Sequence, residues 1–401
     1  MKKLTIFPMI LILFVCFACD TKQKGRSYLS VGRDKLIESG LAIEAVQLLT
    51  EAEKKEEDKT EPRALLVIAY SHALASGVTK GQDFESEYKR QRAERIDALN
   101  EAEINKMIEI LSKRSEVQQN GFQALVEKGT DAAVLLIDNL AEGLYPKADS
   151  NFITTLTKMG SKAVDPILDK IADADVNPNV KIILIRVIGE IGDEKVVERL
   201  NAIDMTNISD AFKISIYATL YRLGEKKYKS EILSGLTSNE AGVRRAAAKV
   251  MANLENVNTT TLITALKDSD SQVVTDITKA LAVHKNKDAV KPLANILKSE
   301  HGASAKKAVV NTLIAYAEAG SGLTKGLAKH LSLMLINKEV SSSEDRVRLL
   351  QLLKHPVMVK KLKAAIVVDD LDAKLYDYLQ TDEESAFVKV ELNELLNLIR
   401  K

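Results

Sequence analysis

Apolar residues recur every three to four positions through most of this chain, in runs that are longer than β-strands. Between residues 160 and 320 a similar sequence unit repeats several times, and each copy consists of an apolar helical run, a short turn and a second apolar run. The run before Gly192 forms a single apolar stripe at helical spacing from Leu184, Val187, Ile188 and Ile191. An isolated pair of helices cannot bury such a stripe, whereas stacked neighbours can. The pattern therefore predicts an all-α chain of helical hairpins stacked in a row.

The turns between the two runs recur at a near-constant interval. Within one residue, they fall at Gly129, Gly160, Gly192, Gly224, Glu255, Asn286 and Gly320. Subtracting successive numbers gives 31, 32, 32, 31, 31 and 34 residues, and a fixed period in this range indicates stacked supersecondary units. Gly192 and Gly224 suit the left-handed residue that ends a helix. Pro166 and Pro292 lie early in second helices, near the first turn, where a missing amide proton does little harm.

The run GVRRAAAKVMANL resembles the short bacterial variety of HEAT repeat, through Val243, Arg244, Ala246, Ala247, Ala248 and Leu254. The resemblance covers residues 129–320, which is 320 − 129 + 1 = 192 of 401 residues. It implies an α-solenoid, a HEAT-like superhelix of stacked helical hairpins. It implies little about activity, because this fold carries many functions.

The N-terminus has the pattern of an export signal. Two lysines and a short apolar run occupy residues 1–17, and Ala18 and Cys19 follow. This ending resembles the lipobox of bacterial lipoproteins, which implies cleavage between Ala18 and Cys19 and lipid attachment to Cys19. Cys16 stands where that pattern usually has Leu, so a plain signal peptide or a membrane anchor remains the alternative. The resemblance implies a lipid-anchored protein of the bacterial cell envelope, at the inner or outer membrane and facing the periplasm.

Charge and cysteine content narrow the classes of function. The net charge of +1 becomes +1 − 2 = −1 without residues 1–18, which carry two lysines and no acids. A near-neutral chain gives no electrostatic reason to bind nucleic acid. Cys16 and Cys19 are the only cysteines, so the exported body has neither a disulfide framework nor a thiol nucleophile.

The pattern divides the chain into a lipoprotein signal peptide (1–18), a polar tether (19–27), an N-terminal helical region (28–115), the HEAT-like array (116–321) and a C-terminal helical cap (322–401). The N-terminal region resembles the turn and second helix of a tetratricopeptide unit at Gly40, Ala45, Leu49 and Ala52. Gly32 and Arg33 replace the Leu-Gly pair usual in the preceding helix, so a generic hairpin remains the alternative. We expect one long charged helix over residues 83–115, and a cap with a polar outer face at the C-terminal end.

Motifs for catalysis do not assemble in this sequence. The deoxyhypusine hydroxylases, a HEAT-like family of enzymes, hold two irons with paired His-Glu dipeptides, and none of the five histidines here is followed by Glu. The repeats also resemble those of phycobilin lyases, but pigment attachment is cytosolic and the leader indicates export. GSGLTKG, at residues 320–326, lacks the spacing of a phosphate loop. We expect no catalytic residue, no metal and no cofactor, and we interpret His284 as a helix-end histidine.

The remaining candidates lie on the surface. Second helices of a solenoid normally line its inner curve, and their polar positions here include Lys195, Glu198, Arg199, Lys227, Lys229, Glu231 and Lys291. These residues form either a groove for a peptide or partner helix, or ordinary solvated positions. The sequence favours a non-enzymatic scaffold or adaptor for other envelope proteins or peptides, tethered to the membrane through its N-terminal lipid. Two alternatives stay open: an enzyme subunit whose site a partner completes, and a structural lipoprotein with one permanent partner.

Overall fold

The computed structural model describes residues 27–37, 41–113, 118–285, 287–319, 325–340, 342–381 and 385–401, and every regular element in these ranges is a helix. The prediction of an all-α fold is confirmed. The chain divides into two compact units, residues 1–199 and 200–401. Their boundary falls inside the predicted repeat array.

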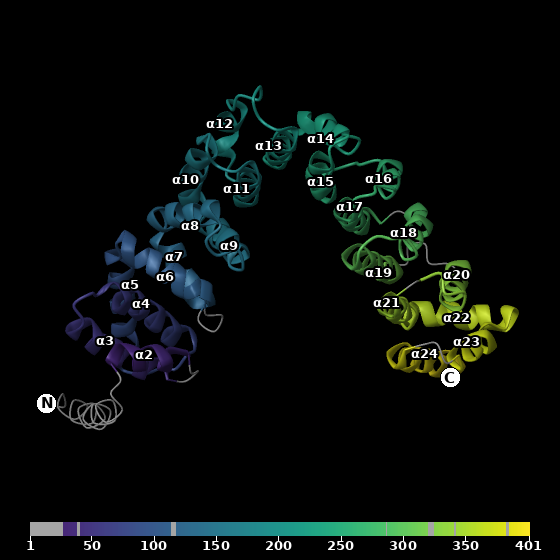
Figure 1. Cartoon of the computed structure of the whole chain (residues 1–401), viewed down its shortest axis with the longest axis horizontal. Coiled ribbons are helices and arrows are strands. Elements are labelled where there is room, and N and C mark those ends of the chain that lie inside the picture. Colours follow the sequence, from purple (N-terminus) through teal and green to yellow (C-terminus); the bar gives the residue numbers. More distant parts are fainter. Residues whose placement is uncertain are drawn as a thin grey trace. The chain divides into compact units, whose positions relative to one another are not determined.

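The described part of unit 1 starts with a helical hairpin at Tyr28, the first residue of the predicted N-terminal helical region. Its helices are α2 (Tyr28–Ile37), α3 (Ala42–Lys55), α4 (Thr60–Ala75), α5 (Glu85–Ala98), α6 (Glu101–Lys113), α7 (Gln118–Lys128), α8 (Thr130–Glu142), α9 (Asp149–Met159), α10 (Ser161–Ala172) and α11 (Pro178–Ile191), with the short η2 (Glu194–Val196) and α12 (Val197–Asn201) at the unit boundary. From α6 onward the helices stack in two rows, α6–α8–α10 and α7–α9–α11 (Figure 1).

Unit 2 continues the same construction. Its helices are α13 (Asp210–Arg222), η3 (Lys226–Tyr228), α14 (Lys229–Gly235), α15 (Ala241–Val250), η4 (Met251–Asn253), α16 (Thr259–Ala265), α17 (Ser271–His284), η5 (Lys287–Ala289), α18 (Val290–Ile296), α19 (Ala303–Glu318), α20 (Lys325–Ile336), α21 (Ser343–Leu353), α22 (Pro356–Asp369), α23 (Leu371–Leu379) and α24 (Ala386–Arg400). Helices α13, α15, α17, α19, α21 and α24 pack in one continuous row (Figure 1). The second helices α14, α16 and α18 have only seven residues each.

Hydrogen bonds between neighbouring hairpins repeat the interval found in the sequence. In unit 1, Lys170 donates to Asp138, 32 residues away. In unit 2, the Tyr316 hydroxyl donates to the Leu281 carbonyl at 2.7 Å, 35 residues away, and the Tyr221 hydroxyl accepts from the Glu255 amide, 34 residues away. The period therefore measures the step from one stacked hairpin to the next.

The predicted turn markers coincide with unusual backbone. Gly192 ends α11 in the left-handed conformation (φ 75°, ψ 23°), and Gly224 also has positive φ (107°). Gly160 has φ 62° and ψ −135°, close to a region that essentially only glycine occupies. Near the marker at Glu255, Asn256 takes positive φ (51°). The markers Asn286 and Gly320 lie outside the described residues.

The two prolines differ in their surroundings. Pro292 is the third residue of α18, in the first turn as predicted. Pro166 is the sixth residue of α10, so the prediction that it lies near the first turn is wrong. A proline there leaves the carbonyl four residues earlier without its helical donor. That carbonyl belongs to Lys162, and it accepts at 3.3 Å from the hydroxyl of Thr130, at the start of α8. The neighbouring hairpin thus supplies the missing hydrogen bond.

The predicted apolar stripe of α11 lies in the core. Leu184, Val187 and Ile188 are buried, together with Ile185, whereas Ile191 is half-buried. Small residues let helices approach closely elsewhere in unit 1. A Cβ added to Gly32 of α2 would lie 2.9 Å from Leu49 Cγ in α3. Ala45, Leu49 and Ala52 are fully buried in α3, and the marker Gly40 lies outside the described residues.

The prediction of one long charged helix over residues 83–115 is wrong, because α5 ends at Ala98 and α6 begins at Glu101. The side chain of Asn100 accepts from the Glu103 amide, and the side chain of Glu103 accepts from the Asn100 amide, both at 3.0 Å. This reciprocal pair is a capping box, which satisfies two amides at a helix start. Leu99 ends α5 with a non-helical backbone (φ −58°, ψ 127°), and its side chain is buried.

The starts of two C-terminal helices have clear local causes. Ser342 caps α21 by accepting from the Asp345 amide at 3.0 Å, and Pro356 begins α22. The outer face of the terminal helix α24 is mixed, whereas a polar face was expected, because Phe387 is 81% exposed and Val390 58% exposed beside exposed polar residues such as Glu394. No helix within the described ranges combines the length and apolar content of a membrane span.

Candidate functional site

The surface residues singled out in unit 1 lie at its last hairpin. Lys195 and Glu198 are exposed. Arg199 contacts Asp165 and lies 3.5 Å from Asp169, two carboxylates of α10 on the preceding hairpin. Arg199 therefore already bridges neighbouring repeats, as an exposed ion pair of small energetic value.

Those singled out in unit 2 lie on two hairpins, Lys227, Lys229 and Glu231 in η3 and α14, and Lys291 in α18. Lys227 pairs with Glu225 at 2.8 Å, and Lys291 is exposed on α18. Lys229 is half-buried and donates to the carbonyls of Glu255 at 2.7 Å and Asn256 at 3.0 Å, on the next turn. The side chain of Lys229 thus holds a repeat junction. Glu231 is exposed and accepts from Ser230.

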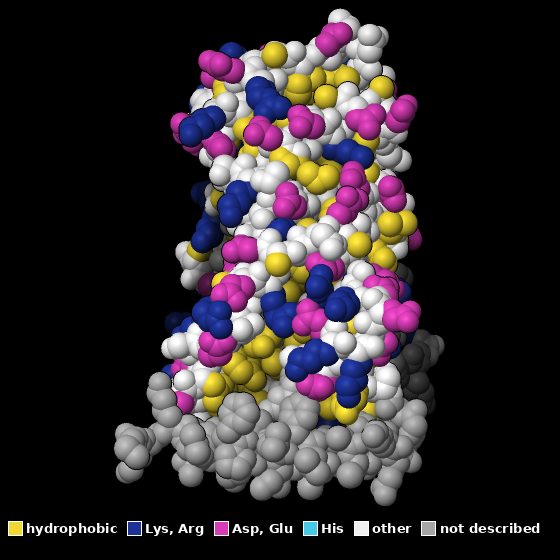
Figure 2. All heavy atoms as spheres, turned by 90° about the vertical axis from the view of Figure 1, so that its left-hand side faces the viewer, with side chains coloured by type: hydrophobic (Ala, Val, Ile, Leu, Met, Phe, Trp, Pro, Cys, Tyr) yellow, Lys and Arg dark blue, Asp and Glu magenta, His cyan; other side chains and the backbone are white. Residues whose placement is uncertain are grey.

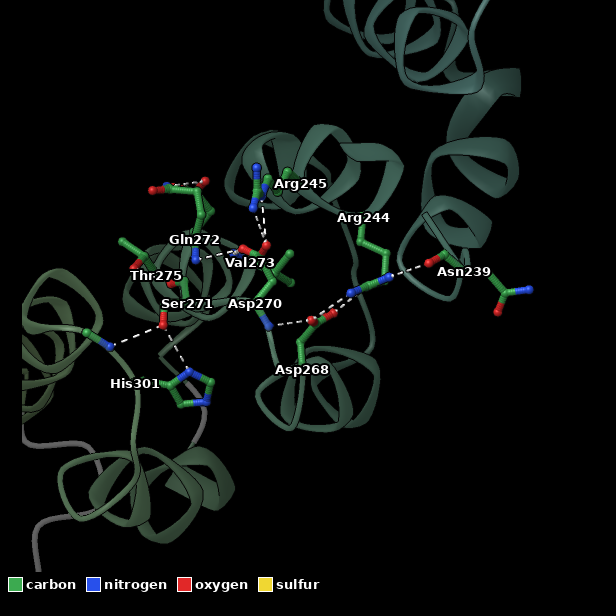
Figure 3. A network of polar contacts seen from close by, with 12 residues as sticks. Asn239, Arg244, Arg245, Asp268, Asp270, Ser271, Gln272, Val273, Thr275 and His301 are labelled. Carbon is green, nitrogen blue, oxygen red and sulfur yellow. Dashed lines mark hydrogen bonds and ion pairs between the residues drawn. The ribbon is translucent and has the colours of Figure 1, made fainter. Parts of the chain in front are cut away.

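A denser polar network joins three successive segments of unit 2 (Figure 3). Arg244 of α15 donates twice to Asp268, at 2.6 and 3.1 Å, and also to the carbonyls of Ser238 and Asn239. Arg245 donates to Asp270, which in turn caps α17 by accepting from the Gln272 and Val273 amides. Burial raises the pKa of Asp268, but hydrogen bonds led by that from Arg244 outweigh it, so the pKa is lowered.

The same network reaches the following hairpin. The Ser271 hydroxyl accepts from the Gly302 amide at 3.1 Å and lies 3.2 Å from His301 Nδ1 (Figure 3). In this network carboxylates and hydroxyls accept from helix starts and loop amides. Such bonds fix the register of stacked hairpins, so we interpret this network as structural rather than catalytic.

The titratable side chains do not form a metal site in the part of the chain that the structure describes, which contains no group of three or more His, Cys, Asp or Glu residues suited to a metal ion. His284 is the last residue of α17, as predicted for a helix-end histidine, and its Nε2 lies 3.2 Å from the Met251 carbonyl. Ala18, Cys19 and most of the GSGLTKG loop lie outside the described residues.

A groove that the sequence did not reveal runs between α6 and α8 in unit 1. Its volume is about 500 Å³, and it is lined by Thr60, Glu101, Ala102, Asn105, Lys106, Glu109, Leu135, Asp138, Asn139, Glu142, Leu144 and Tyr145. The α6 members recur three or four residues apart, which places them on one helical face. The spacing of the polar residues of α6 already indicated a common face. Because residues 83–115 were expected to form one continuous helix, that face was not recognised as part of a groove.

A second groove, of about 330 Å³, lies between α7 and α9 in the other row of unit 1. Its lining is mainly amide and hydroxyl groups, with Phe122 and Val126 as apolar members. Both grooves are formed jointly by helices of neighbouring hairpins. On the face of unit 1 that Figure 2 draws, Lys and Arg side chains are interspersed with Asp and Glu, without a continuous basic patch.

The comparisons with known proteins give weak likenesses of fold. No protein-family model matches the sequence, and no curated protein matches it. An engineered protein is similar at 15% identity, with 89% of this chain and 99% of that chain covered and a TM-score of 0.39. Kap121p bound to Nup53p is similar at 14% identity, with coverage of 90% and 45% and a TM-score of 0.40. Human deoxyhypusine hydroxylase in complex with glycerol is similar at 12% identity, with coverage of 74% and 97% and a TM-score of 0.29.

Proposed function

We propose that this chain is a protein-binding scaffold or adaptor of the bacterial cell envelope, tethered to the membrane by lipid on Cys19. The observation that carries the binding role is that neighbouring hairpins jointly form open grooves, of about 500 Å³ between α6 and α8 and about 330 Å³ between α7 and α9. Concave surfaces shared by several repeats are how solenoids recognise extended partners. The apolar stripes of the helices are already used in stacking, so binding would fall to these grooves and to the exposed side chains.

The first experiment is cross-linking of the full-length chain in native membranes, followed by purification in mild detergent and identification of the captured proteins. An adaptor should capture several envelope proteins, and a structural lipoprotein should give one partner in fixed stoichiometry. Capture of nothing above a matched control lipoprotein would contradict the binding role. Turnover by the lone purified chain on any substrate would instead favour an enzyme.

The residues Lys195, Arg199 and Lys229 permit a test of the surface singled out from the sequence. Reversing all three charges should weaken capture if the second helices bind the partner. Lys229 also donates to the carbonyls of Glu255 and Asn256, so circular dichroism must show that the variant is folded. A folded variant with undiminished capture would move the binding surface to another part of the chain.

The lipid anchor rests on the resemblance of Ala18-Cys19 to a lipobox. Two or more acyl chains are what stable membrane attachment requires. Because Cys19 is the residue proposed to carry these chains, Cys19→Ala should give an unacylated and uncleaved chain. The change would be seen as a changed mass and a changed partition between detergent and water. If mass and partition both equal those of the wild type, Cys19 carries no lipid.

A further inference from the structure

We propose that the groove between α6 and α8 is the docking site for a basic segment of a partner protein, one that carries an apolar side chain beside its Lys or Arg residues. This inference rests on the proposed scaffold function and names the chemistry of the partner. It is carried by charge, by one unpaired polar atom and by the apolar rim of the groove.

The side chains that line the groove carry a net negative charge. Its lining has the carboxylates Glu101, Glu109, Asp138 and Glu142 against the single cation Lys106, so the lining sums to −4 + 1 = −3. Cations outside the lining compensate part of this charge: Lys170 donates to Asp138 at 2.8 Å, and Lys113 to Glu109 at 2.7 Å.

Two of the carboxylates make no direct contact with a cation, although the charge of Glu142 adds, after the hydrogen bond to Asp138, to the raised pKa of Lys170. Neither Glu101 nor Glu142 has a hydrogen-bond or ion-pair partner among the described residues, and both are exposed. Glu101 is the first residue of α6 and Glu142 the last residue of α8. The carboxylate of Glu101 already benefits from the positive end of its helix, whereas that of Glu142 stands at the negative end of α8, where a cation is favoured. Glu142 should therefore attract a Lys or Arg of the partner more strongly than Glu101 does.

The floor of the groove offers a hydrogen-bond acceptor. Asn139 is only 7% exposed, and its Nδ2 donates to the Leu135 carbonyl at 2.7 Å and to Asn105 Oδ1 at 3.4 Å. Both partners are acceptors, which fixes the orientation of the Asn139 amide. Its Oδ1 then faces no donor from the described residues. This oxygen is open to the groove, so a Lys, an Arg or a backbone amide of the partner would donate to it.

The rim of the groove supplies the apolar contact. Leu144 is 54% exposed just beyond the end of α8, and the half-buried Tyr145 follows it. From Glu101 to Glu109 the groove follows α6 over eight residues, or about 12 Å at 1.5 Å per residue. An extended segment spans this length with about four residues. The groove thus fits a short stretch in which one or two cations flank an apolar residue that packs on Leu144.

The test uses the full-length chain purified in detergent and two fluorescent peptides of about eight residues, one alternating Lys with Leu and one in which Glu replaces every Lys. Fluorescence anisotropy should show saturable binding of the basic peptide, weakening as salt is added, and little binding of the acidic one. The double variant Glu101→Gln with Glu142→Gln should bind the basic peptide about 5-fold more weakly, because two partly exposed ion pairs are lost. Neither carboxylate makes a direct ion pair within the protein, and Lys170 keeps its hydrogen bond to Asp138, so the variant should fold normally.

The matched control is Glu57→Gln with Glu194→Gln, which removes two exposed carboxylates of unit 1 outside the groove. It should bind the basic peptide as the wild type does. Leu144→Ser should weaken the Lys-Leu peptide but not a Lys-Ser peptide of the same charge.

Equal affinity of the groove variant and the control would overturn the proposal, as would equal binding of the acidic peptide. Self-association of the chain that is lost only in the groove variant would assign the groove to a second copy and equally overturn it. If these results appear while cross-linking still captures envelope proteins, the docking site lies elsewhere and the scaffold function stands. If cross-linking captures nothing, the scaffold function itself fails, whatever the peptides do.

Discussion

The ion pair between Lys306 and Asp345 is the most deeply buried charge contact between stacked hairpins of unit 2, among the described pairs. Lys306 Nζ of α19 lies 2.8 Å from Asp345 Oδ2 of α21, 39 residues away, and the two side chains are only 7% and 9% exposed. Asp345 also accepts from Arg348 at 2.6 Å. Removing one member of such a pair leaves a buried charge without its partner, which costs about 3–5 kcal/mol.

The variant Asp345→Asn keeps the volume of the side chain and removes its charge. We expect it to destabilise the α19–α21 interface by about 3 kcal/mol, the lower end of that range, because the Asn oxygen still accepts a hydrogen bond from Lys306. The matched control is Glu344→Gln. Glu344 also contacts Arg348, but its side chain is 72% exposed, so the control should cost less than about 1 kcal/mol.

Amide hydrogen exchange is the appropriate measurement, because repeat arrays open locally and a single unfolding free energy of the whole chain is not well defined. Protection factors in α19 and α21 should fall about 100-fold in Asp345→Asn, the equivalent of about 3 kcal/mol. They should change little in Glu344→Gln. Equal losses in the two variants would refute the reasoning from burial.

The pH dependence of stability provides a second test of the contribution of Asp345. Burial raises the pKa of Asp345, but hydrogen bonds from Lys306, Ser342 and Arg348 outweigh it, so the pKa lies below its ordinary value of 3.8. A lowered folded pKa means that the carboxylate contributes stability above the unfolded pKa, which is lost as the pH falls through the folded value. The difference between wild type and Asp345→Asn should therefore be constant near neutral pH and narrow below about pH 4.

The architecture could be predicted because the sequence of each unit alone shows an apolar helical face that must pack against a neighbouring unit. The stripe of α11 and the near-constant turn interval both reflect one physical need, the burial of an apolar helical face against a neighbour. The resemblance that located the array, at Val243 and Ala247, concerns residues that the structure buries.

The candidate groove could not be predicted from the sequence, because its lining depends on how neighbouring helices are aligned along each other. Asn105 and Asn139 meet only because α6 and α8 stack 34 residues out of phase, and no local pattern states that offset for a particular pair. The break before α6 was an error of a different kind. Asn100 and Glu103 have the spacing of a capping box, but the charge-rich run on both sides of Leu99 was interpreted as one helix.

Two further substitutions test a helix cap and a turn in unit 1. Asn100→Ala removes the acceptor for the Glu103 amide and should cost about 1 kcal/mol, seen as faster hydrogen exchange in the first turn of α6; Asn105→Ala, in the middle of that helix, is the control, and equal exchange in both would contradict the capping role. Gly160→Ala tests the turn before α10. Gly160 has φ 62° and ψ −135°, and a Cβ there would meet nothing within 4 Å, so any cost comes from the backbone alone. Gly143, the left-handed C-cap of α8 with φ 65° and ψ 29°, has equally open surroundings. An alanine is tolerated in the left-handed region at about 1 kcal/mol, whereas the conformation of Gly160 should cost up to about 3 kcal/mol. Gly160→Ala should therefore lower protection in α9 and α10 more than Gly143→Ala lowers it in α8, and a reversed order would show that the ψ value at Gly160 carries no strain.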